Sequence, residues 1–207
     1  MSRSTNAVLS AAVLSAVTLS SNAAITGTTG QVMQIAVPPS AVFGAIVGTP
    51  ASAWNEQQGF VTTGLPCDLT VNPSNSGSPT PGIVAGLLDS HIIHWNDFTG
   101  IAITGTVTFN NPIAGVAYTD NFLNASDLIA GAFGTIYPTG FANRGINSTP
   151  GNTSFVSILN NTISFNLDLL PGVVDFDQIR VYTRVPTPGS LALLGAGGLM
   201  VARRRRK

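Results

Sequence analysis

Apolar and polar residues alternate with a period of two in several stretches of the middle of the chain. The clearest stretches are 101–110, 162–169 and 178–183. In 101–110, isoleucine, valine and phenylalanine fall on one side of an extended chain, and three threonines fall on the other. Because successive side chains of a strand point to opposite faces, this pattern predicts strands with one apolar and one polar face.

Shorter apolar runs predict further strands at 31–37, 41–47, 59–63, 68–71 and 90–95. One short helix is expected over 124–129, with Ser126 as its N-cap. About ten short strands without alternating long helices indicate a mainly β chain. We therefore expect one antiparallel β-sandwich or jelly roll, with a short helix at each end of the chain.

Asparagine, glycine and proline separate the predicted strands. Asn160 and Asn161 stand between two strand-like runs and predict a two-residue hairpin. The sequence 110–112 (Asn-Asn-Pro) predicts another hairpin, between 101–110 and a strand at 113–119. The Ser, Pro and Gly-rich segment 72–82 is expected to be a surface loop, because residues 24–71 alone would form a very small domain.

The charges are few and unevenly distributed along the 207 residues. The nine basic and nine acidic side chains cancel, and only 9% of residues are charged, against about a quarter in ordinary domains. Residues 24–185 contain three arginines and all nine acids, a net charge of −6. Nucleic-acid binding needs a basic face, so this balance argues against it. A single cysteine, Cys67, excludes an intramolecular disulfide and a cysteine-based zinc site.

The N-terminus has the pattern of a secretory signal peptide over residues 1–23. Arg3 provides a positive start, and residues 7–19 contain no charge. Ser21 and Ala23 place small residues at positions −3 and −1 of a cut before Ala24. We therefore expect signal peptidase to release an exported body, 24–185.

The C-terminus, 186–207, combines a proline-rich start, an apolar segment (190–202) and a basic end (203–207). A helix over 190–202 would be about 20 Å long, short of the ~30 Å hydrocarbon core. The terminal cations would stay on the cytoplasmic side while the body is outside. The residues expected in the membrane are Ser190, Leu191, Leu193, Leu194, Leu199, Met200, Val201 and Ala202, followed by the basic residues Arg203, Arg204, Arg205, Arg206 and Lys207.

This tail resembles the PEP-CTERM sorting signal of Gram-negative and related bacteria. The match consists of Val185-Pro186-Thr187-Pro188, the Leu- and Gly-rich run and the arginine cluster, in the family's order and spacing. Thr187 stands where the family usually carries Glu. The resemblance implies processing by an exosortase-type membrane enzyme and delivery to the cell surface or an exopolysaccharide matrix. A simple single-pass membrane anchor is the alternative.

The two histidines are one candidate site in the body. Asp89 and Asp97 flank His91 and His94, a combination found in metal and acid–base sites. On a strand, residues three apart point to opposite faces, so both rings reach one ion only if the chain bends. The alternative is a strand with polar contacts on both sides.

A second candidate is the group of oxygen-bearing side chains Asp120, Asn121, Asn124 and Asp127. Calcium prefers six to eight oxygen ligands, so these residues are a possible calcium site. Their spacing does not match the EF-hand pattern. The alternative uses the same side chains for turn and helix-cap hydrogen bonds.

Flat aromatic side chains are candidates for stacking on sugar rings. Trp54, Trp95 and Tyr137 are the main ones, with Tyr118 and Tyr182 as further candidates. The alternative for each is packing in the core.

Catalytic motifs are absent from the sequence. Glu56 is the only glutamate, so a glycosidase would have to use aspartate pairs. Asp175 and Asp177 are either further oxygen ligands or a pair that faces solvent before an edge strand. The expected function is that of an exported, non-catalytic protein of the cell surface or matrix. The alternatives are a carbohydrate-binding module that could use calcium, and, more remotely, a secreted hydrolase.

Overall fold

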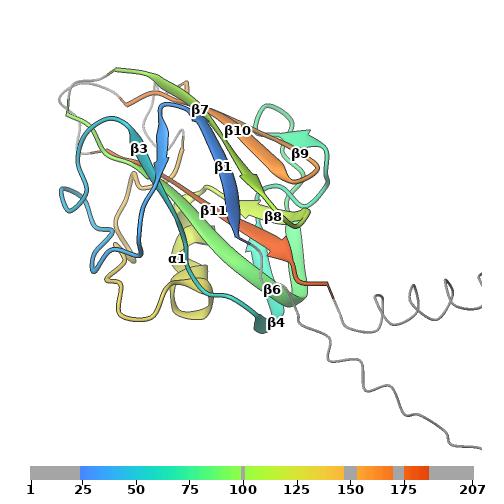
Figure 1. Cartoon of the computed structure of the whole chain (residues 1–207). Coiled ribbons are helices and arrows are strands. Elements are labelled where there is room, and N and C mark those ends of the chain that lie inside the picture. The colour runs from blue at the N-terminus through green and yellow to red at the C-terminus, as the bar shows by residue number, and fades with distance from the viewer. Residues whose placement is uncertain (1–23, 99–100, 147–152, 170–174, 187–207) are drawn as a thin grey trace, which may run out of the picture. The chain divides into compact units, whose positions relative to one another are not determined.

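The computed structural model describes residues 24–98, 101–146, 153–169 and 175–186 (Figure 1). The predicted signal peptide lies outside these residues, as does the predicted tail beyond Pro186, including the helix expected in each. Within the described ranges no helix is long and apolar enough to cross a membrane.

Two β-sheets form the framework of the described chain, which has a single helix, so the prediction of a mainly β protein is confirmed. Sheet A is antiparallel, with the order β1-β7-β10-β9-β5. Its strands are β1 (Ile25–Gly30), β7 (Ile103–Phe109), β10 (Thr162–Leu167), β9 (Phe155–Leu159) and β5 (Ser74–Asn75).

Sheet B has the order β2-β3-β6-β11-β8, and β4 pairs with the first half of the long strand β6. Its pairs are antiparallel except for β2 and β3, which run parallel. The strands are β2 (Val32–Gln34), β3 (Ala51–Asn55), β4 (Phe60–Cys67), β6 (Gly82–Trp95), β8 (Ile113–Ala117) and β11 (Asp177–Arg184).

The inner faces of the two sheets share one hydrophobic cluster. Val107 and Phe165 enter it from sheet A, and Ile93 and Val181 enter it from sheet B. The alternation read from the sequence produces this arrangement, because in β7 and β10 every second residue is buried and the residues between are not. Burial of this shared apolar surface is the main stabilising contribution to the fold.

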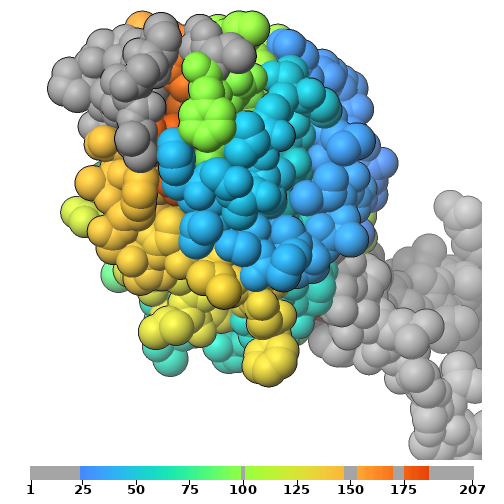
Figure 2. Space-filling model, turned by 90° about the vertical axis from the view of Figure 1, so that its left-hand side faces the viewer, coloured from blue at the N-terminus to red at the C-terminus, as the bar shows by residue number. Residues whose placement is uncertain are grey.

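The outer face of sheet B is covered as well. Helix α1 (Asp120–Ala130) packs there through Leu123, which shares a cluster with Leu88 and Tyr182. The segment 131–146 lies beside the segment 35–48 on this side of the molecule (Figure 2), where Ile136 N donates to Pro39 O at 3.0 Å. Strands β6 and β11 therefore have both faces buried over much of their length.

The helix begins earlier than the sequence predicted. Its N-cap position is Thr119, and Ser126 lies inside it, buried, with its hydroxyl donating to Leu123 O at 2.9 Å. The prediction of Ser126 as N-cap is wrong, because the serine faces the sheet rather than a free helix end.

Two of the predicted strands, both within the described residues, do not form. Residues 41–47 form turns and bends, and residues 68–71 contribute only isolated bridges from Leu69 to Val116 and to Thr80. Each segment still packs one apolar residue inward, since Ala41 and Leu69 are fully buried, whereas Val47 and Val71 are exposed. Apolar spacing in a segment that covers a sheet is thus similar to that of a short strand.

One predicted hairpin is confirmed and the other is wrong. Asn160 and Asn161 connect β9 to β10, and Leu159 pairs with Thr162 across the turn. Asn160 has a φ of 56°, which asparagine tolerates. By contrast, residues 110–112 carry the chain from β7 in sheet A to β8 in sheet B. Strands β7 and β8 do not pair with each other, because β7 belongs to sheet A and β8 belongs to sheet B.

The segment 72–82 is tied to the body along its length. It contains β5, the edge strand of sheet A, and Thr70 N donates to Thr80 O at 3.0 Å. The strands on either side of it, β4 and β6, pair with each other in sheet B. It is therefore a connection within one body.

Candidate functional site

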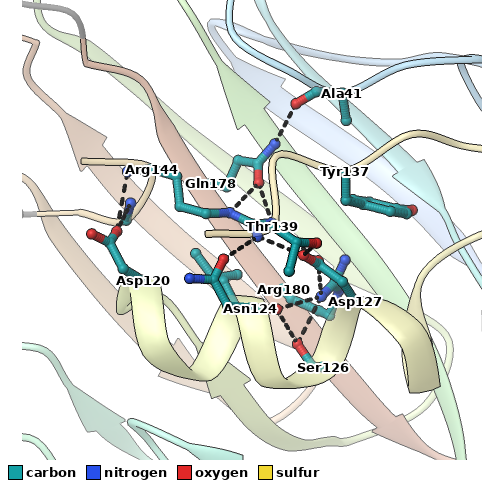
Figure 3. Close-up of polar contacts among 12 residues, drawn as sticks. Ala41, Asp120, Asn124, Ser126, Asp127, Tyr137, Thr139, Arg144, Gln178 and Arg180 are labelled. Atoms are coloured by element: carbon teal, nitrogen blue, oxygen red, sulfur yellow. Dashed lines mark hydrogen bonds and ion pairs between the residues drawn. The ribbon is translucent and has the colours of Figure 1, made fainter. Parts of the chain in front are cut away.

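Arg180 occupies the centre of a polar network between sheet B and α1 (Figure 3). Its side chain is fully buried and binds Glu56 with two hydrogen bonds, Nε to Oε2 at 2.7 Å and Nη2 to Oε1 at 2.9 Å. Its Nη1 donates to Asp127 Oδ1 at 3.0 Å and to Ser126 Oγ at 2.7 Å. One strand, one helix and the residue after β3 are thus joined through a single guanidinium.

Arg144 extends the network on the other side of Asp127. It is also fully buried, with Nη1 at 2.7 Å from Asp127 Oδ2 and Nη2 at 2.6 Å from Gln178 Oε1. The Gln178 amide in turn donates to Ala41 O at 2.9 Å. Two arginines and two acids therefore neutralise one another inside the protein.

The surroundings keep the acid and base of this network ionised. Burial alone would raise the pKa of Asp127, but the hydrogen bond from Arg144 and the charge of Arg180 hold it below its usual value. Burial would lower the pKa of Arg180, but Glu56 raises it well above the ordinary value. Breaking the network by removing one partner would leave a buried, unpaired charge.

Tyr137 links this network to an open pocket of about 660 Å³. Its hydroxyl donates to Glu56 Oε1 at 2.6 Å and accepts from Ala132 N at 2.8 Å, and its ring lies over Arg180. Leu128 and Phe133 line the pocket and are almost fully exposed. Of the three main sugar-stacking candidates, Tyr137 lines this pocket, with its hydroxyl already in use.

The tryptophans do not serve as stacking surfaces. Trp54 and Trp95 are both 0% exposed. Trp54 packs with Ala41 and Ile92 on the outer side of sheet B, and Trp95 belongs to the cluster between the sheets. The interpretation of these two residues as sugar-binding is wrong, since each is enclosed by the fold.

The four candidate calcium ligands do not form an oxygen cage. Asp127 and Asn124 both accept hydrogen bonds from Arg144, and Asn121 is exposed. Asp120 accepts from the backbone N–H groups of Asn143, Arg144 and Gly145, at 2.8 to 3.0 Å. In the part of the chain that the structure describes, no group of three or more His, Cys, Asp or Glu is placed to hold a metal.

We expect replacement of Asp120 by alanine to lower the free energy of unfolding by about 2–3 kcal/mol, because three part-buried backbone donors lose their acceptor. Chemical denaturation measures this, with the exposed Asn121→Ala as a control that should change stability little. A rise in the unfolding midpoint on addition of calcium, lost in Asp120→Ala, would contradict this role.

The two histidines lie on opposite faces of β6, as their spacing predicted. His91 contacts Asn55 at 2.8 Å and stacks near Phe109 in the core. His94 faces the other side, where its Nδ1 lies 2.9 Å from Gln178 Nε2. Burial lowers the pKa of His91 to about 3 and that of His94 to about 4, so both rings are neutral. They do not share a site.

The acids at the start of β11 are interior residues. Asp175 and Asp177 are 2% and 0% exposed, and Asp177 Oδ2 accepts from Ser154 Oγ at 2.8 Å. Burial raises the pKa of Asp177 well above its usual value, with Asp175 adding to the effect. The interpretation as a solvent-facing pair before an edge strand is wrong, because β11 lies between β6 and β8 and its start is enclosed.

The body carries almost all of its charge inside. Of the twelve charged side chains in 24–185, only Arg184 is exposed. Three aspartates are half-buried, and the other eight residues are buried: Glu56, Asp68, Asp89, Asp127, Arg144, Asp175, Asp177 and Arg180. The surface therefore consists mainly of hydroxyl, amide, backbone and apolar groups.

The sequence contains only an indirect signal for this network. Gln178 and Arg180 resemble ordinary polar positions of a strand, because alternation along β11 does not show that both faces are covered, and Arg144 lies in a segment without a strand or helix pattern. The low charged fraction was the available clue, since a chain with so few charges has little reason to pair them on its surface.

No family model, curated protein or solved structure matches this chain.

Proposed function

We propose that this chain is an exported, non-catalytic protein of the cell surface or exopolysaccharide matrix, with a β-sandwich body sorted through its C-terminal tail. The observation that carries the proposal is the nearly uncharged surface of the body. Such a surface suits contact with uncharged polymers and offers no cationic patch for a polyanion. The single exposed cation in 24–185, Arg184, adjoins the start of the tail.

The start of the body supports removal of residues 1–23. Ala24 N donates to Asn110 Oδ1 at 2.8 Å, and Asn110 N donates back to Ala24 O at 3.2 Å. Cleavage before Ala24 would place a positive amino group against this amide oxygen. A charged donor strengthens such a hydrogen bond.

The state of the acids supports a non-catalytic role. Glu56 accepts hydrogen bonds from Arg180, Tyr137 and Ser90 through its two oxygens. Asp127 is bound by both arginines and by Thr139. A general acid or base must exchange a proton with substrate, and acids occupied in this way are poorly suited to it.

Mass spectrometry of the cell-surface fraction tests the proposal. We expect a protein that begins at Ala24 and lacks Arg203–Lys207. The double variant Pro186→Ala, Pro188→Ala is the control, and it should stay in the membrane fraction with its basic end intact. An extracellular protein that still carries Arg203–Lys207 would contradict sorting by tail removal.

A further inference from the structure

The outer side of sheet A is a polar surface. The outward residues of β7 and β10 have short, uncharged side chains, and we call them the hydroxyl face: Thr104, Thr106, Thr108, Thr162, Ser164 and Asn166. All are exposed or half-buried, while the residues between them enter the core. In Figure 1, α1 lies beside β11 and away from β9 and β10.

The hydroxyl groups on this surface form rows across the strands. Thr106 pairs with Ser164, and the row continues to Thr29 on β1 and Ser157 on β9. A second row pairs Thr108 with Thr162. Neighbouring strands are about 4.8 Å apart, and successive outward residues about 6.8 Å, so the hydroxyls repeat regularly in two directions.

Cross-strand hydrogen bonds orient these hydroxyls and leave part of their capacity unused. Thr29 Oγ1 lies 2.7 Å from Thr106 Oγ1, and Thr108 Oγ1 lies 3.1 Å from Thr162 Oγ1. Each such pair needs only one of its two O–H groups, and every hydroxyl oxygen has two acceptor sites. The surface can therefore both donate to and accept from a ligand that is itself rich in hydroxyl groups.

Apolar side chains lie next to the polar rows. Phe155 and Leu159 point outward from β9 and are 41% and 60% exposed. They pair with Asn166 and Thr162, so they extend the same surface on one side. A pyranose ring has an apolar C–H face as well as hydroxyl groups, and such side chains can pack against that face.

From this arrangement we infer that the outer surface of sheet A binds a neutral polysaccharide, lying across the hydroxyl face with sugar rings against Phe155 and Leu159. This inference rests on the proposed location outside the cell. The uncharged rows match an uncharged polymer, and with Arg184 as the one exposed cation of 24–185 an acidic polymer gains little. The pocket beside Tyr137 is the poorer site, because the two carboxylates that line it, Glu56 and Asp127, are already bound by arginines.

The test is retention of the full chain, purified in non-ionic detergent, on insoluble neutral polysaccharides. Amorphous cellulose, curdlan and granular starch are the probes, with soluble alginate as an acidic competitor. We expect retention on at least one probe that neither high salt nor alginate abolishes, because the contacts are uncharged.

Matched variants locate the binding surface. The double variant Thr106→Val, Ser164→Ala removes two central hydroxyls and leaves the buried apolar residues of both strands unchanged. We expect it to lose at least tenfold in apparent affinity. The control Thr63→Val makes the same change at an exposed threonine of β4 and should bind normally. Phe133→Ala at the pocket should also bind normally.

Three results would overturn the inference: no retention on any neutral probe, unchanged retention in the double variant, or a loss caused by Phe133→Ala. Self-association that the double variant abolishes, without retention on any probe, would assign this face to a second copy of the chain instead. None of these results bears on tail removal, which is measured on the cell-surface fraction.

Discussion

Replacing Arg180 with methionine is expected to lower the free energy of unfolding by about 3–5 kcal/mol. The change leaves Glu56 and Asp127 in the interior without the guanidinium that joins them. Domains of this kind are stable by roughly 5–15 kcal/mol, so the loss is large enough to unfold much of the protein on mild heating. Urea unfolding of the two proteins measures the difference.

Arg184→Met is the matched control, because Arg184 lies on the same strand but is exposed. Its stability should stay within about 0.5 kcal/mol of the original. If Arg180→Met does not fold, the double variant Arg180→Met, Glu56→Gln keeps the prediction testable. It removes the charge of Glu56, which Arg180→Met leaves without a cationic partner, while Asp127 keeps its ion pair with Arg144, so it should be the more stable of the two. A loss below about 1 kcal/mol for Arg180→Met would show that the network contributes little.

Acid is expected to destabilise the protein between about pH 6.5 and pH 4. Both histidines are neutral in the folded state, where the pKa of His91 is about 3 and that of His94 about 4. In the unfolded chain they take up protons near pH 6.5, so the unfolded state binds more protons and stability falls as pH falls. The two histidines together contribute several kcal/mol to this fall.

Burial lowers the pKa of His94 most, the charge of Arg144 lowers it further, and the contact with Gln178 also favours the neutral ring, whereas the hydrogen bond to Ile46 O raises the pKa. Its Nδ1 accepts from Gln178 Nε2, and its Nε2 lies 3.3 Å from Ile46 O. A proton on Nδ1 would set two donors against each other. Burial also raises the pKa of Asp68 and Asp177, and these two groups oppose the trend because they favour the folded state as pH falls.

Unfolding measured across this pH range separates the contributions. His94→Gln should remove about one proton from the slope, or about 1.4 kcal/mol per pH unit between pH 4 and 6.5. Ile92→Val is the control, since it trims a buried neighbour on β6 and should lower stability about equally at every pH. An unchanged slope in His94→Gln would contradict a neutral, buried His94.

Together these features explain how the body, residues 24–185, has an almost neutral surface. Its arginines and acids stabilise contacts between sheet B, α1 and the segment 131–146. The hydroxyl face is formed by the opposite sheet, where no such cover exists among the described residues. Burial of the charged side chains therefore leaves the surface of the body nearly neutral. The proposed matrix role depends on this neutral surface.

The sequence by itself determined the local features. Period-two alternation predicted β7, β10 and their buried faces, and Asn160–Asn161 predicted the hairpin, because strand pleat and turn conformation depend on neighbouring residues. The spacing of His91 and His94 likewise placed them on opposite faces. The signal peptide over 1–23 and the sorting tail over 186–207 stay predictions from the apolar runs and basic residues at the chain ends.

Only the tertiary structure decided which faces are covered and which residues meet. Arg180 and Glu56 are far apart in the chain, and their pairing requires β3 and β11 to flank β6 in one sheet. The sequence pattern allows Trp54 and Trp95 to face solvent. In the structure, the covering segments enclose Trp54 and the second sheet encloses Trp95. Alternation shows that two faces differ, but what packs on each face depends on long-range contacts, which a local pattern does not contain.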